Sequence, residues 1–189
     1  MTSDKYRPEA GGSRGEATRG RVLDAAERLL RDGKADFSMR DLAAAAGVSF
    51  ATPFNQFGSK AAIMHALSSR RIDTMVERFT KAVQPASAGE RVGIAVEIAV
   101  AVMLEEPGVN RAVMGWIGTA GPKPGQALER STALWELALG EEDAVPELPR
   151  QLAVAFRGVL SFWTAGELSD AELASTAGSV AAALMRGVE

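Results

Sequence analysis

The chain has 189 residues, of which 47% are hydrophobic and 24% charged, with a formal net charge of −3 and no cysteine. This length and apolar content suit one compact domain or a small domain on a larger one, and the missing thiols exclude disulfides, thiolate zinc sites and cysteine nucleophiles. Charge is unevenly spread, because residues 1–60 hold ten basic and eight acidic residues (net +2) whereas residues 61–189 hold eleven and sixteen (net −5).

Enzymatic and membrane functions find little support in the composition. A single histidine, His65, and a single tyrosine, Tyr6, leave little material for acid–base or metal chemistry. The longest apolar stretch, Val92 to Leu104, is interrupted by Glu97 and is shorter than the roughly 20 residues that span a bilayer. The N-terminus lacks the apolar segment of a signal peptide. We therefore expect a cytoplasmic protein with no catalytic residue, metal or cofactor and no membrane partner.

Three helices are predicted near the N-terminus. Thr18 is expected to cap the first, and Gly33 lies where that helix should end. Ser38 is expected to cap a short second helix that stops at Gly47. Ser49 is expected to cap a third. Before them, Pro, Gly and Ser cluster between Pro8 and Gly15 among charges of both signs, which predicts a flexible tail over residues 1–15.

The rest of the chain also has helical periodicity. A long helix is expected from Ser59 to a point before Pro85. Further along the chain, a break rich in Gly and Pro is expected between Gly115 and Gly125. No segment alternates with the period of a strand, so the predicted fold is all-α. Further helices are expected over 89–105, 124–140, 147–166 and 169–187.

The segment SMRDLAAAAGVSFATPF, which begins at Ser38, has the parts of a helix-turn-helix. Leu42 and Ala46 give its first helix a buried face, and Gly47 can adopt the positive φ of the turn. Val48 then fills the corner. The next helix would bring its first residues to base edges in the major groove, so the segment predicts binding to double-stranded DNA.

Residues 18–67 resemble the N-terminal domain of TetR-family transcriptional regulators, in the order helix, Gly, capped helix, A-G-V-S turn, recognition helix and F-x-S-K. The resemblance implies a three-helix DNA-binding head over residues 16–60, followed by a helical ligand-binding and dimerisation bundle over residues 61–189. It also implies a homodimer that represses transcription and leaves its operator DNA when a small, largely apolar effector binds.

The same resemblance implies which residues contact DNA. Phosphate contacts are expected at the start of the second helix, in the recognition helix and at the start of the next, from Ser38, Arg40, Thr52, Phe54 and Lys60. Ser49 would open the recognition helix, whose free N–H groups suit phosphate. The residues best placed to read base edges are Phe50, Ala51, Asn55 and Gln56.

Two positions in the recognition helix depart from the family pattern. Phe54 stands where tyrosine is common and lacks the hydroxyl that would bond a phosphate. Pro53 stands where an aliphatic residue is common. These departures keep a second interpretation open, in which the head has lost DNA binding and the protein is a helical small-molecule carrier or interaction module. An enzyme is a distant third, since no nucleophile and base can be paired from the spacing.

In the second half, the resemblance implies a four-helix interface between the last two helices of two subunits. The segment 152–163 has two apolar stripes, one for the core and one, Ala155, Gly158 and Phe162, for a partner. Glu97 is a polar ligand candidate that would otherwise face Arg157. The expected effector-binding residues are large and mostly apolar: Met75, Phe79, Glu97, Met103, Met114, Trp116, Trp135 and Trp163.

Overall fold

The computed structural model describes residues 11–117, 127–140 and 145–187, and these form nine α-helices without a strand. The predicted all-α class is confirmed. Contacts divide the chain into two compact units, Met1–Lys60 and Ala61–Glu189. Residues 1–10 of the expected tail and residues 118–126 of the expected break lie outside the described part.

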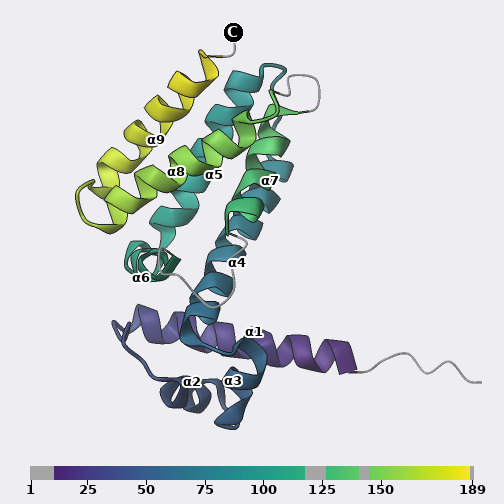
Figure 1. The fold of residues 1–189 in the computed structure, drawn as a ribbon, viewed down its shortest axis with the longest axis vertical. Helices are drawn as coiled ribbons and strands as arrows, with labels where there is room; N and C mark the ends of the chain where they lie inside the picture. The colour runs from purple at the N-terminus through teal and green to yellow at the C-terminus, as the bar shows by residue number, and fades with distance from the viewer. Residues whose placement is uncertain (1–10, 118–126, 141–144, 188–189) are drawn as a thin grey trace, which may run out of the picture. The chain divides into compact units, whose positions relative to one another are not determined.

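The N-terminal unit is built on α1 (Gly11–Arg31), against which α2 (Met39–Ala46) and α3 (Ala51–Phe57) pack (Figure 1). The buried side of α1 carries an apolar stripe that includes Val22, Ala26 and Leu30. Gly33, at φ 75°, ends the helix as expected.

The start of α1 corrects the predicted tail. The helix begins at Gly11, so residues 11–15 are helical and Thr18 is an interior residue. Its hydroxyl donates to the Arg14 carbonyl at 2.9 Å, four residues back, and does not cap the helix. Nucleation is the costly step of helix formation, and each residue added to an existing helix gains a hydrogen bond. The helix therefore extends to the N-terminal side of Thr18, the cap that the sequence predicted.

The turn into the helix-turn-helix forms as predicted. Ser38 and Asp41 make a reciprocal capping box, in which the Ser38 hydroxyl accepts the Asp41 N–H at 3.2 Å and the Asp41 carboxylate accepts the Ser38 N–H at 2.8 Å. Gly47 adopts the left-handed conformation at φ 62°. The Val48 N–H then donates to the Ala43 carbonyl at 3.0 Å, which fixes the corner.

Pro53 is the third residue of α3 and is buried. Phe50, not Ser49, occupies the N-cap, and no side chain caps the helix there. The Ser49 carbonyl, which an N–H at position 53 would have reached, accepts the Thr52 N–H at 2.9 Å instead. Since the first helical N–H groups have no intrahelical partner in any case, the proline leaves no ladder bond unmade.

The C-terminal unit contains α4 (Lys60–Lys81), α5 (Ala88–Glu105), α6 (Pro107–Ile117), α7 (Ala127–Leu139), α8 (Leu148–Thr164) and α9 (Asp170–Met185). In this unit α9 packs on α5 and α8, and α7 packs on the same two helices (Figure 1). One continuous core joins them. None of the described helices is both long and apolar enough to cross a membrane.

Helix α6 was missed by the sequence prediction, which ended a helix at 105 and placed the next after the break. Its first residue is Pro107, a position that proline favours in a helix. Arg111 of α6 donates to Asp170 of α9 at 2.7 Å, and its guanidinium carbon lies 4.4 Å from the centre of the Trp163 ring. These contacts tie α6 to two other helices, and tertiary packing of this kind stabilises a helix with little signal of its own.

We expect Pro53→Ala to lower the free energy of unfolding by about 1–2 kcal/mol, because it loosens the unfolded chain and removes buried methylenes while offering no new ladder bond. Urea denaturation followed by circular dichroism measures this change. The exposed neighbour provides the control, since Asn55→Ala should stay within about 0.5 kcal/mol of the unsubstituted protein. A gain in stability for Pro53→Ala would show instead that the proline strains α3.

Candidate nucleic-acid interface and internal cavity

Helix α3 presents an exposed aromatic and polar face in the N-terminal unit. Phe50 and Phe54 are 54% and 42% exposed, and their ring centres lie 5.5 Å apart in an edge-to-face arrangement. Ala51 and Asn55 are also exposed. Two phenylalanines left in water are unusual unless they meet a partner. The face therefore combines groups that could contact a thymine methyl and an adenine edge.

Arg40 of α2 places positive charge beside this face. Its guanidinium carbon lies 5.6 Å from the centre of the Phe50 ring, within cation–π range. Ser38 is exposed too, but its hydroxyl donates to the Asp41 carboxylate at 2.7 Å. That bond, with the bond from the Ser38 N–H, lowers the pKa of the Asp41 carboxyl. The Ser38 hydroxyl is thus occupied by helix capping.

Three further residues of the predicted DNA set are partly engaged within the unit. The Ser49 and Thr52 hydroxyls lie 2.8 Å apart, within hydrogen-bonding distance of each other. Gln56 is half-buried, and its backbone carbonyl accepts from Arg19 of α1 at 2.9 Å. That contact satisfies a carbonyl at the C-terminal end of α3 and fixes the helix to α1.

Lys60 has a role in the structure that the sequence did not predict. Its ammonium donates to the carbonyls of Ala35 and Phe37, each at 2.8 Å, and lies 4.2 Å from the centre of the Phe37 ring. Burial lowers the pKa of this ammonium. In this arrangement Lys60 closes the loop between α1 and α2, and its expected phosphate contact stays a prediction.

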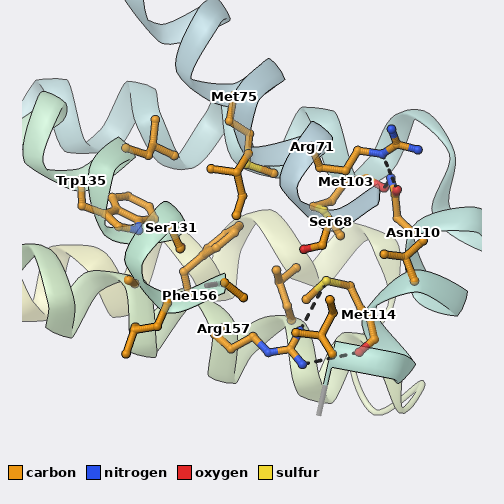
Figure 2. Close-up of a pocket in the computed structure, with 18 residues that line it drawn as sticks. Ser68, Arg71, Met75, Met103, Asn110, Met114, Ser131, Trp135, Phe156 and Arg157 are labelled. Atoms are coloured by element: carbon orange, nitrogen blue, oxygen red, sulfur yellow. Dashed lines mark hydrogen bonds between the residues drawn. The ribbon is translucent and has the colours of Figure 1, made fainter. Parts of the chain in front are cut away.

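The C-terminal unit encloses a cavity of about 230 Å³ between α4, α5, α6, α7 and α8 (Figure 2). Its wall is mostly apolar, with Phe156 and Trp135 in edge-to-face contact at 5.7 Å. Helix α4 contributes Ser68, Arg71, Ile72 and Met75. Four of the residues predicted to bind a ligand line it: Met75, Met103, Met114 and Trp135.

The other four predicted ligand residues lie elsewhere. Phe79 packs into the core, and Trp163 is fully buried with its indole N–H donated to Asp170 at 2.8 Å. Trp116 does not line the cavity. Glu97 is exposed in a separate groove of α5 and α9, and Arg157 lines the cavity, so the two do not face each other. Helical spacing predicts which large apolar residues are buried. It does not predict which of them line a cavity and which pack in the core.

Polar residues that the sequence analysis missed also line the cavity. Asn110 is buried, accepts the Arg71 Nε–H at 2.8 Å and donates its amide to the carbonyls of Val102 and Met103. It thereby satisfies carbonyls in the last turn of α5. No local pattern identifies it, because Asn110 and Arg71 meet across 39 positions of the chain.

Arg157 reaches the cavity from α8. Its guanidinium donates to the Met114 sulfur at 3.4 Å and to the Met114 carbonyl at 3.5 Å (Figure 2). Burial lowers the pKa of this guanidinium. Among the described residues no group of three His, Asp or Glu side chains is placed to hold a metal ion.

Comparison with known proteins fits this geometry. The family model described as "Bacterial regulatory proteins, tetR family" matches residues 22–67, which span the C-terminal part of α1, all of α2 and α3, and the start of α4. A comparison with curated protein sequences returns no significant match.

Solved structures extend the likeness to the whole fold. A TetR transcriptional regulator from Rhodococcus sp. RHA1 is 25% identical with a TM-score of 0.78, over 89% of this chain and 96% of that one. A TetR-family transcriptional regulator from Streptomyces coelicolor is 22% identical with a TM-score of 0.57, over 91% and 99% of the two chains. The helix-turn-helix of the N-terminal unit thus matches the tetR family of bacterial regulatory proteins, and the chain as a whole shares the fold of TetR-family transcriptional regulators.

Proposed function

We propose that this regulator is a homodimeric repressor that leaves its operator when a small effector enters the cavity of the C-terminal unit. The observation that carries the proposal is the cavity itself, a largely apolar space of about 230 Å³ inside the bundle. Sites for small molecules are mostly apolar, with a few placed polar groups, and Asn110, Arg71 and Arg157 supply such groups here.

Helix α4 gives the effector a route to the DNA-binding unit. It begins at Lys60, the last residue of the N-terminal unit, and lines the cavity through Arg71 and Met75. A ligand that displaces the cavity end of this continuous helix would move the end that joins the head. Two recognition helices must be spaced about one DNA turn apart, roughly 34–36 Å, so a small tilt is sufficient to weaken binding.

The exposed face of α3 supports DNA binding over the interpretation of a degenerate head. Pro53 lies on the buried side of the helix and costs no hydrogen bond. The residues proposed to meet bases, Phe50 and Asn55, remain accessible. The head carries little net charge, so base contacts and shape are expected to supply a large share of the affinity.

Helix α8 supports a homodimer. Its core stripe, which includes Phe156 and Trp163, is buried. On another side Phe162 and Val154, eight positions apart, are each 55% exposed in the single chain. Small residues at Ala155 and Gly158 would let a partner helix approach closely.

Selection from random duplex DNA, followed by gel shift at low salt, tests the repressor proposal. We expect one enriched sequence with two related half-sites, because a symmetric dimer reads DNA twice. Enrichment of no sequence would contradict the proposal and favour a carrier or interaction protein.

On the selected operator, two substitutions in the head should have different effects on DNA binding. Asn55→Ala should weaken binding by about 1–3 kcal/mol and relax preference at one base position of each half-site. Arg40→Ala should weaken binding on every sequence and reduce the dependence of log K on log salt by about 1. Fluorescence anisotropy across a salt series measures both. Arg150→Ala, an exposed arginine of α8, is the control and should change neither quantity.

Phe162→Glu should weaken the dimer about 100-fold or more, because the interface would bury an unpaired charge at a cost of several kcal/mol. Sedimentation equilibrium measures the dissociation constant. The matched control is Leu137→Glu on α7, where the leucine is 49% exposed and no interface is proposed. Equal effects of the two substitutions would place the interface away from α8.

A further inference from the structure

The polar groups of the cavity are unbalanced in charge. Among the described residues that line it there are two arginines, Arg71 and Arg157, and no aspartate or glutamate. Asn110 offers no spare amide hydrogen, since its two donors are used by backbone carbonyls. The cavity therefore combines an apolar wall with positive charge, an arrangement that suits a ligand with an anionic group.

Arg157 is the cation with the weakest partners. Arg71 donates to the Asn110 side-chain oxygen at 2.8 Å, whereas the contacts of Arg157 within the described structure are a thioether sulfur and a carbonyl at 3.5 Å. A half-buried guanidinium that has lost water and gained no carboxylate is costly. An entering carboxylate would recover that cost through charge-assisted hydrogen bonds.

Trp135 provides an independent observation of the same kind. The residue is 1% exposed, and within the described structure its indole N–H has no hydrogen-bond partner. In Figure 2 Trp135 lies beside Ser131, at the opposite end of the view from Asn110. The Trp135 indole and the weakly bonded Arg157 guanidinium are both hydrogen-bond donors. A ligand that carries acceptors would give these two donors stronger hydrogen bonds.

We propose that the effector is an organic acid whose carboxylate binds Arg157 and whose apolar body lies against Met75, Met103 and Phe156. This assignment rests on the proposed effector function of the cavity. A space of about 230 Å³ corresponds to about eight water molecules, or on the order of ten non-hydrogen atoms. A saturated or aromatic acid of that size fits.

Octanoate and octanamide are matched probes, because they share shape and differ in charge. Isothermal titration calorimetry on the full-length protein should show octanoate binding about 10- to 100-fold more tightly than octanamide, the factor expected for hydrogen bonds to a charged group. Octylammonium should bind more weakly than either. Tryptophan fluorescence, to which Trp135 contributes, gives a second readout of occupancy.

Arg157→Met should bring the octanoate to octanamide affinity ratio to about 1 while octanamide still binds, because methionine preserves the apolar wall. The substitution removes a poorly paired buried charge, so thermal stability should not fall. Arg150→Met, an exposed arginine of the same helix, should keep the ratio of the unsubstituted protein. Arg71→Met identifies the other cation, and a loss of preference there but not in Arg157→Met would overturn the assignment to Arg157.

Equal affinity of the unsubstituted protein for octanoate and octanamide, or no binding of octanoate, would overturn the proposed acid. Failure of the effector function gives a different result, in which octanoate binds with the expected preference but leaves the affinity for the selected operator unchanged. That outcome supports an anion site at Arg157 and contradicts release of DNA by its ligand.

Discussion

Side-chain donors that satisfy the carbonyl ends of neighbouring helices are the interaction on which much of this structure depends. Arg28 of α1 donates to Ala45 near the end of α2, and Arg19 does the same for α3. In the second unit Arg91 of α5 donates to Ala138 near the end of α7, and Asn110 of α6 closes α5. Short helices leave a large share of their carbonyls without partners, so these contacts set how the helices meet.

The same interaction makes Arg157 distinctive. Its carbonyl contact, to Met114, is the longest of this group at 3.5 Å, and Arg157 lines the cavity. A structural cation already has strong hydrogen-bond acceptors within the protein, whereas a ligand-binding cation can still gain a strong acceptor from a ligand. Arg28 is occupied by a good acceptor, whereas Arg157 lies where a better acceptor than sulfur could arrive.

The recognition helix α3 accommodates a proline without losing a hydrogen bond. Pro53 falls in the first turn, where N–H groups have no intrahelical partner, and its ring faces the interior. The exposed side of α3 is then free to carry Phe50, Phe54 and Asn55. Because this surface is aromatic and uncharged, its specificity would depend on base edges and groove shape more than on counterion release.

The sequence by itself determined the helical class, the capped turn from Ser38 to Gly47 and the core stripe of α8, because capping and helical periodicity act over a few residues. Only tertiary structure decided that α6 is a helix, that Lys60 closes a loop and that Met114 lines the cavity while Trp163 does not. Those outcomes depend on groups brought together from distant parts of the chain. A cavity is defined by the space between helices, so local sequence patterns do not predict it.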